Sequence, residues 1–360
     1  MSPRTVAVSR LGMPLTGLVI AGGRGLRLWP ESRSGRPKPL FSPDGRTTLL
    51  SLTITRVQPL IARRHLFILC SADQAPLFAR ATAGLVPKEN LLVEPEGRGT
   101  AVAIAYGCAV IRRRVGAALT AVMPADHLIA PASGLRRTLA RAFSLAASDE
   151  RIAVVGVAPA RAEPGFGYQE IGPAVGAGFR VRRFIEKPPL ALARRMVACG
   201  RFWWNAGIFV MSTATLESEL SRHAPALAAL TVRMAQAGPR RLARLYAGLR
   251  YDSFDRVVVE KSSRVVAVKA DFRWHDVGSW QGLWEALKGS RTNALSPNAF
   301  AIDCEGVMAR ASRRPMVLLG VKDLVAVDAG EILFITTRAR SQELKRLGPE
   351  LGRRGLGRYL

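Results

Sequence analysis

The chain has 360 residues, of which 48% are hydrophobic and 22% charged, and its formal net charge is +26 at pH 7. This length allows one large domain with an appendage, or two medium domains. The composition is ordinary for a globular protein. No apolar run approaches the length that spans a bilayer, which argues against a membrane protein.

The N-terminal residues lack the basic segment, apolar core and cleavage site of a signal peptide. The four cysteines are far apart, and no pair has the spacing of a metal or redox site. They are Cys70, Cys108, Cys199 and Cys304. We therefore expect a cytoplasmic protein in a reducing environment.

The positive charge has two interpretations. One is a nucleic-acid surface, where clustered cations displace counterions. The other is an excess of cationic side chains that bind small phosphorylated anions. The arginines are scattered, and they are dense only at 112–114 and in the tail 345–358. No aromatic residues interleave with them as a base-stacking platform requires. We expect no specific nucleic-acid partner, while nonspecific association with polyanions stays open.

Short apolar runs alternate with segments of helical spacing in the first half of the chain. The apolar runs are 17–21, 66–70, 91–93, 120–123 and 152–157, and the helical segments are 49–61, 75–83, 100–113 and 135–147. Continuously apolar strands separated by helices indicate a sheet that is buried on both faces. We predict a Rossmann-like, doubly wound α/β fold with a mixed, mainly parallel sheet, and ligands at the carboxyl ends of its strands.

The second half is less regular. "GFGYQEIG", "FRVRRFIEKP", "WWNAGIFVMS" and "RVVAVKADFRW" predict strands, 224–249 predicts a helical stretch, and "GSWQGLWEAL" predicts a helix with Ser279 as its cap. After "SPNA", short apolar runs alternate with Asp, Gly and Lys, which favours a small β-rich unit. We expect a catalytic domain over 13–292, a β-rich domain over 296–342 and a basic tail over 343–360.

The stretch "LVIAGGRGLRLWP" carries a glycine-rich turn directly after a strand. Gly22, Gly23 and Gly25 allow backbone N–H groups to converge on one point, as in phosphate cradles. The spacing is not that of a Walker loop, and Leu28 stands where a dinucleotide fingerprint has its third glycine. A plain tight connection would use the same residues. Arg24, Arg27 and Lys38 between two prolines favour the phosphate-binding interpretation, since arginine and lysine neutralise phosphate.

The stretch "AGGRGLRLWPESRSGRPKPL" resembles the signature of the sugar-phosphate nucleotidyltransferases, in particular the branch that acts on mannose-1-phosphate and GTP. Further similar segments follow in order along residues 15 to about 340. They are "EPEGRGTAVAIA" (94–105), "MPADHLI" (123–129), "GFGYQEIG", "FIEKP" (184–188), "WWNAGIFVMS" (203–212) and "FDRVVVEKSSRVVAVKADFRWHDVGSW" (254–280). The order of the motifs makes a chance similarity improbable.

The resemblance implies a reaction in which a sugar-1-phosphate oxygen attacks the α-phosphorus of a nucleoside triphosphate and pyrophosphate leaves. Catalysis of this kind consists of positioning and charge stabilisation. The implied catalytic residues are Arg27, Lys38, Asp126 and Asp276, with both aspartates holding one Mg²⁺. The implied nucleotide-binding residues are Ala21, Gly22, Gly23, Gly25, Arg98, Thr100 and Asp126. The implied sugar-phosphate residues are Gly167, Tyr168, Glu186, Lys187 and Asn205.

Each assignment has a plainer alternative. An aspartate after a strand is usually a cap or turn residue, and Glu186 with Lys187 could be a simple surface ion pair. His127 and His275 lie beside the aspartates, yet phosphoryl transfer prefers oxygen ligands. Leu26, Pro39 and Gly99 depart from the family's usual Thr, Gln and Asn.

We expect a monofunctional GDP-mannose-forming enzyme that is a homodimer, with its C-terminal unit similar to the family's short β-helix. The alternatives are a pyrophosphorylase for another hexose-1-phosphate or nucleotide, and a catalytically weak nucleotide-sugar binding protein.

Overall fold

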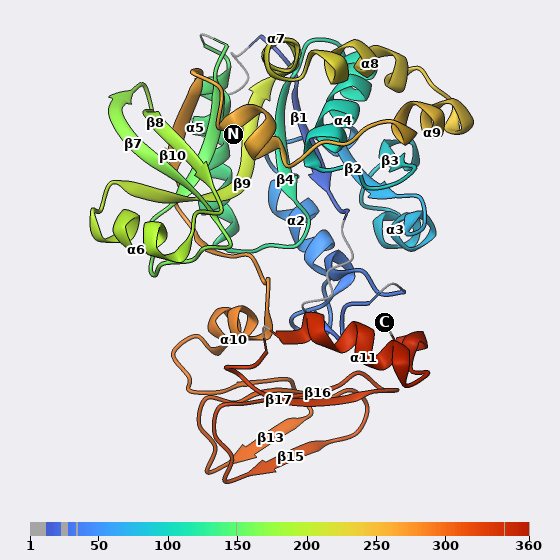
Figure 1. Cartoon of the computed structure of the whole chain (residues 1–360), viewed down its shortest axis with the longest axis vertical. Helices are drawn as coiled ribbons and strands as arrows, with labels where there is room; N and C mark the ends of the chain where they lie inside the picture. Colours follow the sequence, from blue (N-terminus) through green and yellow to red (C-terminus); the bar gives the residue numbers. More distant parts are fainter. Residues whose placement is uncertain (1–11, 23–27, 34, 149, 342, 360) are drawn as a thin grey trace. The chain divides into compact units, whose positions relative to one another are not determined.

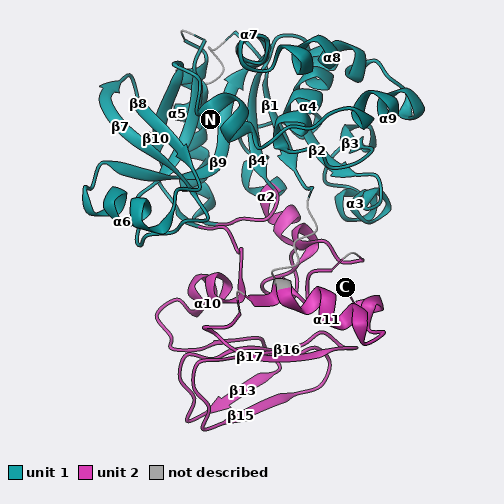
Figure 2. Ribbon diagram, viewed as in Figure 1, with its two compact units in different colours: residues 1–22, 54–124, 129–274 teal, residues 23–53, 125–128, 275–360 magenta. Residues whose placement is uncertain are grey.

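The computed structural model describes residues 12–22, 28–33, 35–148, 150–341 and 343–359. Contacts among residues divide the chain into two compact units, which Figure 2 colours separately. The first unit comprises 1–22, 54–124 and 129–274, and the second comprises 23–53, 125–128 and 275–360. The second unit therefore contains more than the β-rich end of the chain: two early segments belong to it as well.

The first unit is built on a nine-stranded sheet with the order β3-β2-β1-β4-β9-β6-β10-β8-β7 (Figure 1). The strands are β1 (Leu15–Ile20), β2 (Leu66–Ser71), β3 (Leu91–Glu94), β4 (Leu119–Pro124), β6 (Ile152–Val157), β7 (Gly167–Val175), β8 (Gly178–Glu186), β9 (Phe202–Ser212) and β10 (Val265–Lys269). The predicted strands of the first half are therefore confirmed within a few residues.

The sheet is mixed, as expected, but it is not mainly parallel. Parallel pairing joins β3, β2, β1 and β4, and separately β6 and β10, while the other neighbours are antiparallel. The long strand β9 runs against both β4 and β6 and so reverses the direction in the middle of the sheet. An apolar run indicates that a strand is buried, but it does not indicate the direction in which the strand runs in the sheet.

Helices bury both faces of this sheet. Leu18 belongs to a core cluster with residues of four helices, whereas its equally buried neighbour Val19 points to the opposite face. The helices are α3 (Ala75–Thr82), α4 (Thr100–Val115), α5 (Ala132–Ala146), α6 (Leu190–Ala198), α7 (Thr213–His223), α8 (Pro225–Ala235) and α9 (Pro239–Ala247). Short 3₁₀ turns span η3 (Arg63–His65) and η4 (Lys88–Asn90), and a π-helical turn, η5, spans Asp255–Val259.

Two local features follow directly from the sequence. A Cβ at Gly107 would overlap the Leu18 side chain, so the glycine lets α4 pack closely on β1. The single helical stretch expected over 224–249 is divided into α8 and α9, because Pro239 begins a new helix after Gly238.

The second unit combines the early segments with the β-rich end. Its elements are η2 (Lys38–Leu40), α10 (Trp280–Lys288), β12 (Ala294–Leu295), β13 (Ala299–Ile302), β14 (Met308–Arg310), β15 (Met316–Leu319), β16 (Leu324–Asp328), β17 (Leu333–Thr337), η6 (Glu343–Arg346), α11 (Leu347–Arg353) and η7 (Gly357–Tyr359). The strands form a four-stranded sheet, β12-β14-β16-β17, and the parallel pair β13-β15. As expected, Ser279 caps α10 by accepting a hydrogen bond from the Gly282 N–H at 3.1 Å.

Three elements lie where the chain passes between the units: α2 (Leu49–Val57), β5 (Leu128–Ala130) and β11 (Arg273–His275). Within the second unit, Trp29 and Phe41 share one core cluster with Trp280 and Met308. This cluster joins the segment around Lys38 to the C-terminal strands. Among the described residues, no helix combines the length and apolar character needed to cross a membrane.

Candidate active site

The glycine turn begins at the carboxyl end of β1. The Ala21 N–H donates to the Leu69 carbonyl at 2.8 Å and so extends the sheet by one residue, after which Gly22 is exposed. Gly23, Gly25 and Arg27 lie outside the described residues, as do Arg24 and Leu26. Their assigned roles therefore stay predictions.

Glu94, at the end of β3, has no role among those predicted from the sequence. Its side chain is buried, and its Oε2 has no hydrogen-bond partner among the residues that the structure describes. Burial raises the pKa of Glu94 to about 7. A Cβ placed on Gly22 would stand 3.5 Å from Glu94 Oε1, so this carboxyl group borders the glycine turn. The signal in the sequence was an acidic residue that closes an apolar strand.

Arg98 and Thr100 lie where β3 leads into α4. Arg98 pairs with Glu96 at 2.5 Å, and the Thr100 hydroxyl accepts a hydrogen bond from the Phe254 N–H at 2.9 Å. Gly99 has a φ of 91°, and a Cβ there would overlap the Tyr251 carbonyl oxygen. The asparagine of the family pattern would therefore not fit here in this conformation.

A cavity of about 520 Å³ opens beside these residues, and it is lined by Gly97, Arg98, Gly99, Arg250, Tyr251 and Asp252. Arg98 precedes the 16-residue helix α4, and Arg250 and Tyr251 line the same cavity, a combination that suits an anionic ligand with an aromatic ring. The structure thus brings Arg98 to a cavity, which the sequence alone did not show.

The residues assigned to the sugar phosphate gather at the ends of β7, β8 and β9. Glu186 and Lys187 pair at 2.7 Å, and the Glu186 side chain is only 7% exposed. A Cβ at Gly167 would press against the Glu186 carboxylate and lie 3.3 Å from Asn205 Cβ, so the glycine leaves room for both side chains. The structure therefore brings together Gly167, Glu186, Lys187 and Asn205.

Tyr168 differs from its neighbours. Its side chain is fully buried, and its hydroxyl accepts a hydrogen bond from the Glu163 N–H at 2.9 Å. Any contact of Tyr168 with a ligand would therefore be made by its backbone. Its aromatic ring supports the strand β7.

Two acidic residues without a predicted role, Asp255 and Glu260, complete this group. Asp255 Oδ1 accepts a hydrogen bond from Asn205 Nδ2 at 2.7 Å, while Asn205 Oδ1 accepts one from the Gly207 N–H at 2.9 Å. The amide of Asn205 is thereby held in one orientation. Glu260 Oε1 accepts a hydrogen bond from the Glu186 N–H at 2.6 Å. Burial and the nearby Glu186 carboxylate raise the pKa of Asp255 to about 7.

A third group, within the second unit, consists of Lys38, Asp126 and Asp276. Lys38 Nζ lies 2.6 Å from Asp126 Oδ2 and donates to the Asp276 carbonyl oxygen at 2.8 Å. Pro37 precedes the 3₁₀ turn that begins at Lys38, and Pro39 lies inside it, so the backbone of this segment is restricted as expected. Residues that are far apart in the sequence thus converge on one ammonium group.

The charge at Asp126 is controlled by its neighbours. Burial by itself would raise the pKa of Asp126, but the Lys38 ammonium and His127 outweigh it and hold the pKa below its ordinary value. His127 Nε2 lies 3.8 Å from Asp126 Oδ1. His127 therefore stands beside the carboxylate, on the opposite oxygen from Lys38.

The turn that carries Asp276 holds the Asp276 carboxylate in place. The Gly278 N–H donates to Asp276 Oδ1 at 3.1 Å, and a Cβ at Gly278 would overlap Oδ2 of the same residue. Val277 has a φ of 49°, a strained conformation for a β-branched residue, and it is fully buried. Strain of this kind is common where a side chain must be held in a functional position.

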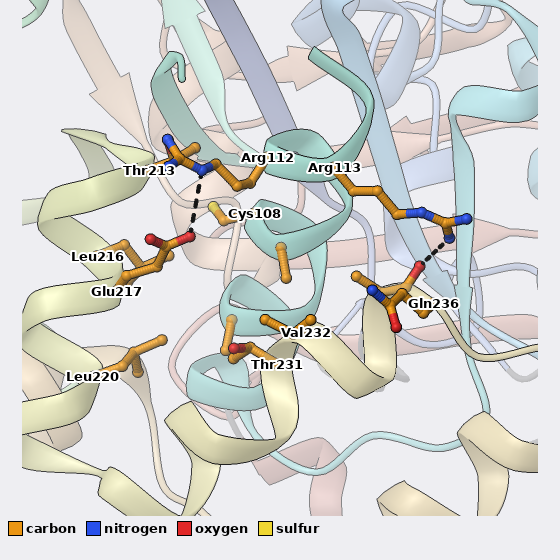
Figure 3. A pocket seen from close by; sticks show the side chains of 13 residues that line it. Cys108, Arg112, Arg113, Thr213, Leu216, Glu217, Leu220, Thr231, Val232 and Gln236 are labelled. Atoms are coloured by element: carbon orange, nitrogen blue, oxygen red, sulfur yellow. Dashed lines mark hydrogen bonds and ion pairs between the residues drawn. The ribbon is translucent and has the colours of Figure 1, made fainter. Parts of the chain in front are cut away.

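A separate cavity of about 230 Å³ lies between α4, α7 and α8, and none of the described residues predicted to bind substrate lines it (Figure 3). Its floor is made of small residues of α4, and at its edge Arg112 faces Glu217 at 3.8 Å while Arg113 donates to the Ala235 carbonyl at 2.7 Å. Both guanidinium groups are thus engaged by the protein itself.

These features define an α/β protein with acidic residues, among them Glu94 and Glu186, at the carboxyl ends of its strands. Residues 16–293 match the family described as nucleotidyl transferase, and the chain belongs to this family.

Similar proteins include the xanthan biosynthesis protein XanB of Xanthomonas campestris pv. campestris, which is 32% identical over 91% of this chain and 71% of its own length. Mannose-1-phosphate guanylyltransferase of Escherichia coli (strain K12) is 31% identical over 92% of this chain and 72% of its own length. A crystal structure described as mannose-1-phosphate geranyltransferase from Thermus thermophilus has a TM-score of 0.87 and 34% identity, covering 94% of this chain and 100% of that chain.

Proposed function

We propose that this protein is a mannose-1-phosphate guanylyltransferase, which converts GTP and mannose-1-phosphate to GDP-mannose and pyrophosphate. A phosphate oxygen of mannose-1-phosphate attacks the α-phosphorus of GTP and forms the new P–O bond. The bond from the α-phosphorus to its bridging oxygen breaks, and pyrophosphate leaves with that electron pair. The observation that carries the proposal is the convergence of Lys38 on Asp126 and Asp276 in a chain of this family.

Lys38 serves the α-phosphoryl group. Its ammonium lies within 2.8 Å of oxygens from both aspartate residues, so it is already held where it can meet a phosphate oxygen. As negative charge shifts in the transition state, a fixed ammonium stabilises it without reorganisation.

The two aspartates also suit a divalent ion, which we propose to be Mg²⁺. The Asp126 carboxylate and the Asp276 carbonyl oxygen both lie within 2.8 Å of one cationic nitrogen, so oxygen donors already converge on a positive charge. Magnesium prefers a few carboxylates, with phosphate oxygens and water as further ligands. Asp126 and Asp276 would hold the ion, which would supply positive charge to the phosphates.

On the nucleotide side, Gly22, Gly23 and Gly25 would cradle the triphosphate, and Arg27 would pair with its β- and γ-oxygens. Arg98 lines the cavity beside α4, where an anion also meets the positive end of the helix. Glu94, in its ionised form, would accept a hydrogen bond from the exocyclic amino group of guanine at Oε2, which has no partner among the described residues.

On the sugar side, Glu186 and Asn205 would bind hydroxyl groups, and Lys187 would bind the phosphate. A carboxylate accepts hydrogen bonds from hydroxyl groups, while an amide both donates and accepts. Asp255 and Gly207 orient the Asn205 amide through these two hydrogen bonds. One N–H of Nδ2 and one lone pair of Oδ1 then serve a ligand.

The test is a turnover panel with purified protein. Release of pyrophosphate is measured with each of GTP, ATP, UTP and dTTP against mannose-1-phosphate, glucose-1-phosphate and galactose-1-phosphate. We expect GTP with mannose-1-phosphate to give the highest kcat/KM. Equal or higher values for another pair would replace the proposed substrates, and no release with any pair would contradict the proposed activity.

We further propose that the C-terminal strands form a short β-helix through which two copies associate. Phe300 pairs with Val317, and Ile302 pairs with Leu319, in the parallel register of β13 and β15. These four side chains are more than half exposed, and so are Leu333 and Ile335 of β17. Phe300, Ile302, Val317 and Leu319 form an exposed apolar patch on β13 and β15, and patches of this kind mark association surfaces. A two-fold dimer would cover this patch on both copies.

Light scattering during size-exclusion chromatography tests the association. Wild-type protein should have the mass of a dimer, and the double variant V317D/L319D the mass of a monomer. A monomeric wild type, or a variant that stays dimeric, would contradict an interface at this face.

A further inference from the structure

Arg310, the last residue of β14, is buried and only 9% exposed. Its Nη1 donates to the Pro43 carbonyl at 2.8 Å, and its Nη2 donates to the Ser42 carbonyl at 2.9 Å. Its Nε lies 3.4 Å from Glu31 Oε1. The planar fork of one guanidinium group thus binds two consecutive backbone carbonyls and a carboxylate, all from the N-terminal part of the second unit.

The same guanidinium group lies over an aromatic ring. Its carbon is 4.6 Å from the ring centre of Phe41, a distance typical of a cation–π contact. The Phe41 N–H in turn donates to the Lys38 carbonyl at 3.0 Å. Arg310 therefore contacts three consecutive residues, 41–43, and the first of them is hydrogen-bonded to Lys38.

A second contact ties this segment to the turn of Asp276. The ring of Phe41 meets the ring of Trp280 edge to face at 6.5 Å, and Trp280 begins the helix that follows that turn. Trp280 Nε1 also donates to the Trp29 carbonyl at 3.0 Å. The segment 35–43, which we name the lysine segment, is thus held between β14 and α10.

We propose that Arg310 is a positioning residue for Lys38: the C-terminal β-strands, through this arginine, hold the lysine segment in the conformation that presents the ammonium group to Asp126 and Asp276. A buried charged group is a weak source of stability, since a well-packed apolar side chain often stabilises as well. What an apolar side chain cannot do is bind two consecutive carbonyls and so hold the backbone in one conformation.

This inference rests on the proposed function for the chemical role of Lys38, but the geometry can be tested without substrate. The first measurement is hydrogen–deuterium exchange of the lysine segment in the full chain. In Arg310→Met the segment should exchange faster than in the wild type, while the segments of the first unit stay unchanged. The second measurement is steady-state kinetics, in which kcat should fall about a hundredfold because Lys38 is displaced. The KM for mannose-1-phosphate should stay near the wild-type value.

The matched control is Arg338→Met. Arg338 belongs to the same unit, stacks over Trp284 at 3.8 Å and pairs with Asp323, yet no hydrogen bond or ring contact joins it to a described residue of the lysine segment. We expect this variant to lose stability without faster exchange in the lysine segment and without the loss of kcat. Arg310→Lys, which keeps the charge but lacks the planar fork, replaces Arg310→Met if the latter does not fold, and it should show a smaller change in the same direction.

Wild-type exchange and wild-type kcat in the Arg310 variant would overturn the proposal. Equal effects of Arg310→Met and Arg338→Met would also overturn it, because they would show a general loss of stability. If the wild type forms no GDP-mannose, the proposed function fails, while the exchange measurement still decides the role of Arg310.

Discussion

Replacing Asp255 by asparagine should make the stability of the protein less sensitive to alkaline pH. Asp255 faces three groups: the carboxylate of Glu186, the ammonium of Lys187 and the amide of Asn205. Burial and Glu186 raise the pKa of Asp255 from 3.8 to about 7. The asparagine keeps an oxygen that can accept the hydrogen bond from Asn205 Nδ2, but it never carries the charge.

The sign follows from proton binding. Between pH 3.8 and pH 7 the folded state keeps a proton on Asp255 that the unfolded state has released, so the free energy of unfolding falls as pH rises through this range. About two pH units of this range lie between pH 5 and pH 7. At about 1.4 kcal/mol per unit, the advantage of Asp255→Asn should therefore grow by at most about 3 kcal/mol between pH 5 and pH 8.5.

Urea unfolding at pH 5 and pH 8.5, followed by tryptophan fluorescence, measures this difference. The matched control is Asp252→Asn. Asp252 is exposed, and its pKa is lowered by hydrogen bonds from the Ser253 N–H and from Arg256. Removing its charge should give no advantage at pH 8.5. An advantage of Asp255→Asn that is the same at both pH values, or larger at pH 5, would refute the reasoning.

Three further predictions concern the proposed active site. Lys38→Met should lower kcat about a hundredfold to a thousandfold. The control Lys288→Met, which removes a lysine that stacks on Trp284, should leave kcat unchanged; equal kcat values for the two variants would show that Lys38 takes no part in the reaction. Gly99→Ala should lose about 1–3 kcal/mol of stability in urea unfolding because of the positive φ and the overlap with the Tyr251 carbonyl, while Gly97→Ala, with open space around its Cβ, should lose little. Chelation with EDTA should abolish pyrophosphate release, and added Mg²⁺ should restore it; undiminished release would argue against a metal at the two aspartates.

Much of the first unit could be predicted from the sequence, because a buried strand and an amphipathic helix each leave a local pattern. The runs that became β1, β2, β3, β4 and β6 were continuous in apolar residues, and Ser279 stood directly before the helix that it caps. The directions of the strands left no such pattern. The reversal at β9 depends on which neighbours the strand meets, and those neighbours are distant in the chain.

The residue types of the candidate site could likewise be anticipated from the order of the motifs, but not their partners. The pair Glu186–Lys187 is adjacent in the chain and was visible as a pair. The support that Asp255 gives to Asn205 spans 50 residues, and the contact between Arg310 and Ser42 spans 268 residues, so neither left a local signal.

The sequence by itself determined the buried strands, the stiff segment around Lys38 and the family to which the chain is similar, because each depends on residues close together in the chain. Only the tertiary structure decided that Lys38 meets Asp126 and Asp276, which are 88 and 238 residues away from it. It also decided that a buried arginine from the C-terminal strands holds the segment that carries this lysine. Long-range contacts of this kind arise from packing, and packing is a property of the folded chain rather than of any short stretch of it.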